Sequence, residues 1–239
     1  MKINWNYIKA VVLASLMVGL YIFCDFRNGA KNVDHMDIIF EGDQNLYITH
    51  ESVNKLLIQN YGPLTNMAKE KLVLNTMEKV LETNEMVKDA QVYLSVDGKL
   101  TSKIVQRKPI GRVEGIKKFY VDDEGKRMPF STNHSARVPI ITGKTTQKGL
   151  EDVYRLLQYI NGDNFLRKNI IGIHIGNDGR YQLKLRLENF VVNLGTMDQL
   201  DSKFNNFRAF YNKAAKDRAL DRYSLVSLEF DKQVVCTKI

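Results

Sequence analysis

The chain has 239 residues, a formal net charge of +8 and 44% hydrophobic residues. This length and composition suit one large or two small folded domains, and they exclude collagen-like, low-complexity and globally disordered chains. The basic residues are interspersed with acidic ones, whereas nucleic-acid binding requires a clustered basic stripe, so nucleic acid is not an expected partner. The two cysteines, Cys24 and Cys236, are too far apart to indicate a disulfide scaffold or a structural zinc site.

The N-terminal segment is apolar. Residues 10–24 form an uncharged run that would make about 22 Å of helix, and extension back to Asn4 adds one charge, Lys9, which can reach the lipid headgroups. We predict a membrane-spanning helix over residues 9–24 after a cytoplasmic tail of residues 1–8, with the lipid bilayer as a partner. A short basic tail and a large following domain favour a cytoplasmic N-terminus and an exported remainder. A cleaved signal peptide and a buried core helix are the alternatives, and retention of the segment is left open.

Residues 34–110 show one compact pattern of strands and helices. The pattern predicts a strand, two helices, and two strands joined by the turn Asp97-Gly98, whose residues tolerate positive φ. The predicted ranges are 36–40, 49–61, 67–81, 90–96 and 100–107, with Pro109 ending the last strand. This βααββ order matches a POTRA domain, a module that binds other polypeptides, often through a sheet edge.

Residues 111–239 are predicted to form a mixed β-sheet domain with two helices. Alternating apolar residues and turn signals mark its strands, and apolar residues at helical spacing mark its helices. The predicted strands cover residues 119–121, 138–141, 171–175, 181–187, 190–194, 223–230 and 233–237, and the helices cover 148–160 and 197–211. The whole chain is therefore expected to be an α+β protein.

The last predicted strand, residues 233–237, is expected at or near an edge of its sheet. Val234 and Val235 are adjacent apolar residues, so each face of this strand carries one of them. Two interpretations stay open, because an exposed edge must be either protected or used. The valines are simply buried in the core, or the strand is a docking edge for a partner strand.

Taken together, these segments resemble the bacterial cell-division family FtsQ/DivIB, over nearly the whole chain. The resemblance rests on the order and spacing of the N-terminal span, the POTRA-like module and several short motifs. These motifs are Ala90-Gln91-Val92, Gln106-Arg107-Lys108-Pro109, Phe119-Tyr120-Val121-Asp122-Asp123-Glu124-Gly125, Val138-Pro139-Ile140-Ile141-Thr142-Gly143, Leu228-Glu229-Phe230 and Gln233-Val234-Val235. The sequence differs from some relatives in having two residues, Lys238 and Ile239, after the last strand.

The resemblance implies a non-catalytic scaffold of the division machinery in the cytoplasmic (inner) membrane. It implies recruitment through the POTRA-like module and binding of the FtsB–FtsL pair through the last strands, with no cofactor and no small-molecule substrate. Transferred by position, the partner-binding residues would be Phe230, Lys232, Gln233, Val234, Val235, Cys236 and Thr237.

Two other classes of function were weighed against this resemblance. A POTRA protein of outer-membrane assembly or secretion usually carries a β-barrel, for which the predicted strands are too few and are interrupted by helices. An enzyme is disfavoured because the chain lacks a G-x-S-x-G or P-loop motif and its four histidines lack the spacing of a metal pair. Among these, His174 is predicted to lie at the surface, opposite Ile173 and Ile175.

Overall fold

The computed structural model describes residues 5–29, 32–42, 45–69, 72–115, 117–144 and 147–239. The chain divides into two compact units, Met1–Gln106 and Arg107–Ile239. The structure is of the α+β class predicted from the sequence.

The N-terminal helix α1 covers Trp5–Gly29. It contains a window, Tyr7–Asp25, with a mean hydropathy of 2.0 that is long and apolar enough to cross a membrane. The helix begins within the tail predicted for residues 1–8, of which residues 1–4 lie outside the described part of the chain. An apolar helix of this length, with no part of its window buried in the protein, is compatible with a single-pass membrane protein.

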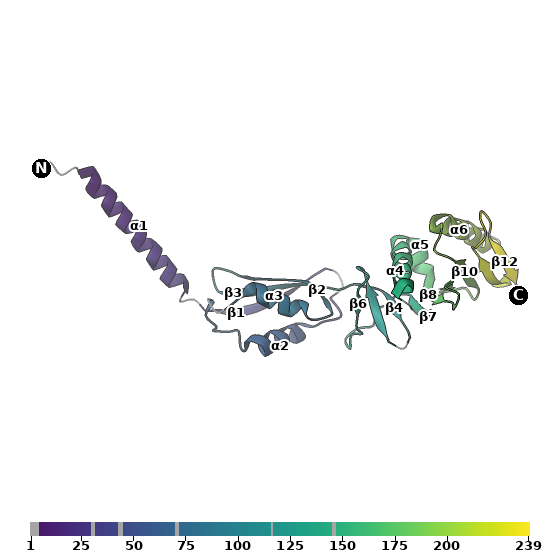
Figure 1. Ribbon diagram of the computed structural model, residues 1–239, viewed down its shortest axis with the longest axis horizontal. Helices are drawn as coiled ribbons and strands as arrows, with labels where there is room; N and C mark the ends of the chain where they lie inside the picture. Colours follow the sequence, from purple (N-terminus) through teal and green to yellow (C-terminus); the bar gives the residue numbers. More distant parts are fainter. Residues whose placement is uncertain (1–4, 30–31, 43–44, 70–71, 116, 145–146) are drawn as a thin grey trace. The chain divides into compact units, whose positions relative to one another are not determined.

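After α1, the described residues of the first unit form a three-stranded sheet and two helices, in the predicted βααββ order. Its elements are β1 (His35–Glu41), α2 (His50–Tyr61), α3 (Leu74–Glu82), β2 (Val87–Leu94) and β3 (Lys99–Gln106). The sheet order is β1-β3-β2, with β1 parallel and β2 antiparallel to β3. Both helices lie beside this sheet (Figure 1) and bury a shared core that includes Leu57, Met77, Leu81 and Ile104.

Local signals explain the first helix and the hairpin of this unit. The Thr49 hydroxyl caps α2 by accepting a hydrogen bond from the Ser52 amide at 3.2 Å, and Gly62 ends the helix at φ +77°. The Asp97-Gly98 turn forms as predicted, with Gly98 at φ +98°. A Cβ atom at Gly98 would lie 2.8 Å from the Asn32 carbonyl oxygen, so both the conformation and the close approach require glycine there.

The predicted helix over residues 67–81 is wrong in its first part. Helix α3 starts at Leu74, and residues 70–71 lie outside the described part of the chain. The segment before α3 instead forms backbone hydrogen bonds with Val33, which precedes β1. The Val33 amide donates to the Met67 carbonyl at 2.9 Å, and the Asn66 amide donates to the Val33 carbonyl at 2.8 Å. Asn66, directly before the predicted range, takes a left-handed conformation, φ +67°, and Ala68 within the range forms an isolated β-bridge with Asn32.

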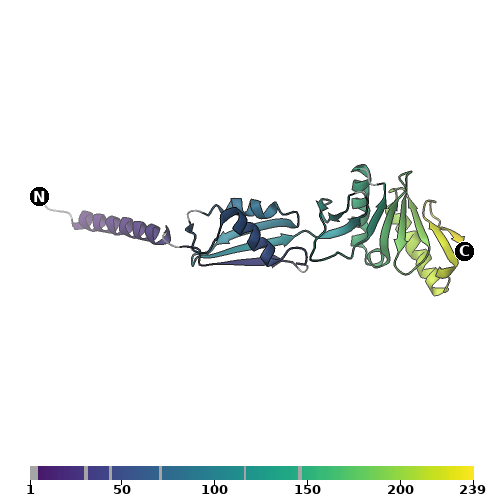
Figure 2. The ribbon, with the colours of Figure 1, turned by 90° about the horizontal axis from the view of Figure 1, so that it is seen from below.

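The second unit is a nine-stranded mixed sheet with helices. The elements are β4 (Pro109–Val113), β5 (Phe119–Asp122), β6 (Arg127–Met128), β7 (Ile140–Gly143), α4 (Gln147–Gly162), α5 (Asn164–Asn169), β8 (Ile170–Ile175), β9 (Tyr181–Leu185), β10 (Val191–Gly195), α6 (Leu200–Lys216), the 3₁₀ helix η2 (Leu220–Arg222), β11 (Tyr223–Ser227) and β12 (Val235–Lys238). The sheet order is β12-β11-β10-β9-β8-β7-β4-β5-β6. Figure 2 shows these strands side by side, with β12 at one margin beside the C-terminus.

Helices connect two of the parallel strand pairs of this sheet, whereas the parallel strands β4 and β7 are joined through β5, β6 and the segment after β6. Strands β7 and β8 are parallel and are joined through α4 and α5, while β10 and β11 are parallel and are joined through α6. Parallel neighbours need such crossovers because a tight turn cannot join them. The helices pack against one face of the sheet and form a single core with it, which includes Leu157, Leu166, Phe204 and Phe207.

Three expectations for this unit need correction. Pro109 begins strand β4 instead of ending the preceding strand. Proline is tolerated as the first residue of a strand, because its missing N–H costs no ladder bond there. A third helix, α5, was missed, although Asp163 is its N-cap and accepts bonds from the Phe165 and Leu166 amides at 2.8 and 3.0 Å. The closing strands are also shorter than predicted, because β11 ends at Ser227 and β12 begins at Val235.

Among the described residues, no helix packs on the other face of the second sheet from β7 to β12, and we call it the open face. Its strand pairing aligns two rows of side chains across six strands. One row is Ile140, Gly172, Lys184, Val191, Leu225 and Thr237; the other is Thr142, His174, Gln182, Asn193, Ser227 and Val235. Beyond β7 the same face is covered by the segment after β6, where the Ala136 amide donates to the Tyr120 hydroxyl at 3.1 Å.

Candidate protein-binding edge

Strand β12 forms one edge of the second sheet. In the described sheet it pairs with β11 alone, antiparallel, from Ser227↔Val235 to Tyr223↔Lys238. The two strands are joined by a seven-residue connection, residues 228–234. The edge thus consists of a short strand and the connection that leads into it.

The backbone of β12 points alternate groups toward β11 and away from it. The Ile239 amide donates to the Arg222 carbonyl at 3.0 Å, and the Ser224 hydroxyl donates to the Thr237 carbonyl at 3.3 Å. Thr237 and Ile239 therefore face β11. In an antiparallel ladder the intervening residues face the opposite way, so the N–H and C=O groups of Cys236 and Lys238 point outward. These groups are placed to pair with an added strand.

The side chains of β12 differ between its two faces. Val235, on the open face, is 42% exposed. Cys236, on the opposite face, is half-buried and packs against the core of the unit, as does Val234. Because the strand begins at Val235, Gln233 and Val234 belong to the connection and not to the strand.

The other residues expected at the binding site also lie in the connection. Phe230 is 49% exposed, which is unusual for a large aromatic side chain. Lys232 is exposed and has a left-handed backbone, φ +56°. Thr237 is exposed on β12 itself. The edge therefore presents apolar side chains beside outward-pointing backbone groups, the combination that strand addition uses.

The Cys236 thiol gives a chemical probe of this edge. Burial raises the pKa of Cys236, and the thiolate is the reactive form. In a Cys24→Ser variant, we expect iodoacetamide at pH 8 to alkylate folded Cys236 several times more slowly than the same chain in denaturant, as measured by intact-mass spectrometry. Equal rates in the two states would show that the thiol is not held against the core.

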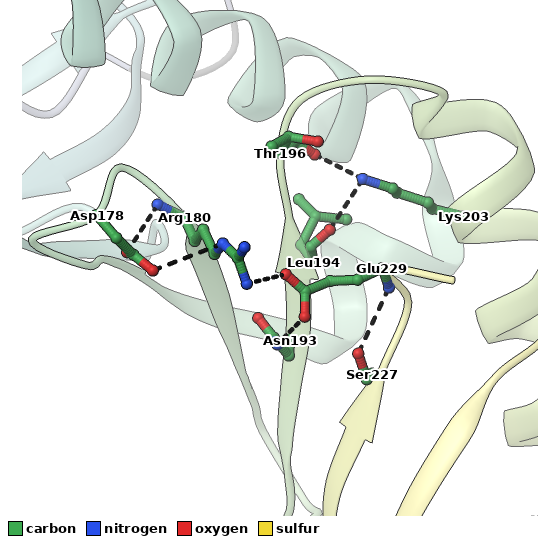
Figure 3. Close-up of polar contacts among 8 residues, drawn as sticks. All are labelled: Asp178, Arg180, Asn193, Leu194, Thr196, Lys203, Ser227 and Glu229. Carbon is green, nitrogen blue, oxygen red and sulfur yellow. Dashed lines mark hydrogen bonds and ion pairs between the residues drawn. The ribbon is translucent and has the colours of Figure 1, made fainter. Parts of the chain in front are cut away.

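A polar cluster behind the connection was not anticipated from the sequence. The Glu229 carboxylate accepts one hydrogen bond from Arg180 at 2.9 Å and one from the Asn193 side-chain amide at 2.7 Å (Figure 3). Asp178 in turn accepts a bond from the Arg180 backbone amide at 3.1 Å. We call Asp178, Arg180, Asn193 and Glu229 the Glu229 cluster. In the sequence Glu229 stands out only as part of the motif Leu228-Glu229-Phe230, and no local pattern links it to an arginine so distant in the chain.

The open face also contains a hollow of about 650 Å³ at β7, β8 and β9. Gly172 contributes no side chain there, and Ile140, His174, Lys184 and Val191 surround the space. His174 is exposed, as predicted, and its Nδ1 lies 3.0 Å from the Thr142 hydroxyl. Within the described residues, no group of three or more histidine, cysteine, aspartate or glutamate side chains could hold a metal ion.

The fold and this edge define a two-unit α+β protein that combines a membrane-competent N-terminal helix with an exposed sheet edge. A family model described as "FtsQ/DivIB, C-terminal related" matches residues 108–237, which is more than half of the chain. The chain belongs to this family, and the match supports a role in cell division. None of the curated proteins compared with the chain matches it.

Proposed function

We propose that this protein is a non-catalytic, single-pass scaffold of the bacterial division machinery, which binds a partner by β-strand addition at β12. The observation that carries the proposal is the free edge of β12, where the backbone groups of Cys236 and Lys238 point away from β11. Added main-chain hydrogen bonds supply affinity in this mode, and alternate side chains supply specificity.

The partner in this proposal is the FtsB–FtsL pair, because family membership suggests interactions with division proteins. The binding surface comprises Phe230, Lys232 and the segment 233–237. Phe230 and Val235 are its large exposed apolar side chains, and buried aromatic residues are common anchors of protein interfaces.

The remaining parts of the chain have supporting roles in this proposal. Residues 1–8 form a cytoplasmic tail, residues 9–24 anchor the chain in the inner membrane, and residues 34–110 are a POTRA-like recruitment module. Residues 111–239 then present the binding edge outside the cytoplasm. Recovery of the full chain with inner-membrane rather than outer-membrane fractions would support this topology and would argue against a role in outer-membrane assembly.

The first experiment is a pull-down from membranes that compares the intact chain with a chain ending at Asp231. We expect the intact chain to retain FtsB and FtsL and the shortened chain to lose them. The shortened chain must still be folded, which circular dichroism of both chains checks. Equal retention would place the partner surface elsewhere and would overturn the assignment to β12.

A proline substitution separates strand addition from other contacts at the same place. In Lys238→Pro, an exposed residue loses an outward-pointing N–H without losing a bond to β11, so we expect partner binding to weaken about tenfold or more. Lys238→Ala removes the side chain and keeps that N–H, so its affinity should stay within about twofold of the parent. Binding of the purified FtsB–FtsL pair to both variants, measured by surface plasmon resonance, decides between these outcomes. Equal affinities would exclude pairing at this position.

A further inference from the structure

We infer that the Glu229 cluster is a positioning device that fixes the connection before β12 and so prepares the edge for its partner. This inference rests on the proposed function for its binding consequence, but its structural part can be tested without any partner. The cluster lies at the end of β11 where the connection leaves the sheet (Figure 3).

The connection is long for its position in the fold. Antiparallel neighbours are usually joined by two to five residues, and such short turns set the strand register by themselves. The seven residues from 228 to 234 cannot do so through turn geometry alone. Register and direction must therefore come from contacts between the connection and the sheet.

Two contacts at the start of the connection meet this need. The Leu228 amide donates to the Asn193 carbonyl at 2.8 Å, which extends the pairing of β10 and β11 by one residue. The next side chain, Glu229, accepts hydrogen bonds from Arg180, the residue before β9, and from the Asn193 side-chain amide of β10. One carboxylate thereby links the connection to β10 and to the turn that leads into β9.

The surrounding backbone is arranged to receive this carboxylate. Gly195 has φ +71°, and a Cβ atom there would lie 2.6 Å from Cγ of Glu229. At the same strand end, the Lys203 ammonium donates to the carbonyls of Leu194 and Thr196 at 3.0 and 2.7 Å (Figure 3). Burial lowers the pKa of Lys203. Lys203 of helix α6 thus fixes the end of β10 by hydrogen bonds, and Gly195 at the same strand end packs closely against Glu229.

The geometry of the cluster has a direct effect on the proposed site. Phe230 follows Glu229 immediately, and Lys232 and β12 follow within a few residues. A fixed Glu229 limits the conformations that these residues sample before binding, so less ordering remains when the partner arrives. Loss of the cluster should free the connection while the core, which is built from other residues, stays intact.

The test uses the full chain with Arg180→Ala, Arg180→Lys and Glu229→Gln. Hydrogen exchange of residues 228–238, measured by mass spectrometry without partner, should become faster in Arg180→Ala and Glu229→Gln. It should remain close to the parent in Arg180→Lys, which keeps a cation near Glu229. The affinity for the purified FtsB–FtsL pair should fall about five- to tenfold in the first two variants and recover in the third.

Arg208→Ala is the matched control. Arg208 pairs with Asp163 on the helix side of the same unit, and the two pairs are similarly exposed, with side-chain exposures of 42% and 26% against 56% and 25% for Arg180 and Glu229. This variant should leave both exchange in residues 228–238 and partner affinity unchanged. A similar effect from Arg208→Ala would show that the loss of any ion pair in the unit speeds exchange in residues 228–238 and weakens binding, without a particular role for the Glu229 cluster.

The remaining outcomes are also decisive. Unchanged exchange in Arg180→Ala and Glu229→Gln would overturn the positioning role, even if affinity fell, because the two residues would then act by touching the partner. Faster exchange with unchanged affinity would overturn the link to binding. If Lys238→Pro also binds normally, the proposal for the edge itself has failed, and the exchange measurement still decides whether the cluster fixes the connection.

Discussion

Replacement of Asp122 by alanine is expected to lower the free energy of unfolding of the second unit by about 3 kcal/mol. The Asp122 side chain is 1% exposed, and its Oδ2 accepts a hydrogen bond from Arg107 at 2.7 Å. Its Oδ1 accepts the backbone amides of Glu124 and Lys126 at 3.0 and 2.7 Å. The variant would leave these part-buried donors without this buried acceptor, and the loss of a buried, charge-assisted acceptor costs more than an exposed ion pair contributes.

Native-state hydrogen exchange of the full chain checks this expectation, because it reports each unit separately. Lys126→Ala is the control: it removes the exposed ion pair of Lys126 with Glu124 and should change stability by less than about 0.5 kcal/mol. Asp122→Asn keeps an acceptor for the turn and should lie between the two variants. A loss below about 1 kcal/mol for Asp122→Ala would contradict the role given to this carboxylate.

The second large effect is expected in the first unit, from Gln106→Ala. The Gln106 side chain is buried, and its Oε1 accepts the Tyr47 and Ile48 amides at 3.0 and 3.3 Å, while its Nε2 donates to the Ile48 carbonyl at 3.1 Å. These bonds hold the segment before α2 against the end of β3, the central strand of the sheet. Three lost hydrogen bonds with buried partners suggest a destabilisation of about 2–3 kcal/mol.

Exchange of the amides in β3 and α2 measures this loss. Gln91→Ala is the control, because Gln91 lies exposed on β2 of the same sheet and should contribute less than about 0.5 kcal/mol. Equal effects from the two glutamines would mean that the buried amide is replaced by water or by rearranged backbone bonds.

The elements that the sequence predicted well are those whose cause is local. The hairpin at Asp97-Gly98 was predicted from two residues that tolerate positive φ, and in the structure Gly98 is the one that takes it. The start of α3 failed because backbone bonds from Val33 compete with the helix, and that pairing depends on tertiary contacts. Helix α5 could have been found, since Asp163 is a recognisable N-cap, but a six-residue helix carries little periodic signal.

The candidate site shows the same division between local and distant causes. The last predicted strand of the domain was expected at or near an edge, and β12 does lie at the end of the strand order. Which backbone groups point outward could not be predicted, because this depends on the register with β11 and on the irregularity between Tyr223 and Leu225. The pairing of Arg180, just before β9, with Glu229, just after β11, joins residues far apart in sequence, and only the folded sheet brings them together.

The position of β12 in the chain has a consequence for how a cell could use this protein. Strand β12 follows the other described strands of its sheet in sequence, and its neighbour β11 is joined to the rest of the sheet by a parallel pairing with β10 that spans helix α6. Non-local pairings of this kind form late, because the chain must first close the intervening loop. A partner that recognises this edge would therefore bind completely folded chains and would not bind partly folded ones. Binding of the partner would then also select for correctly folded protein.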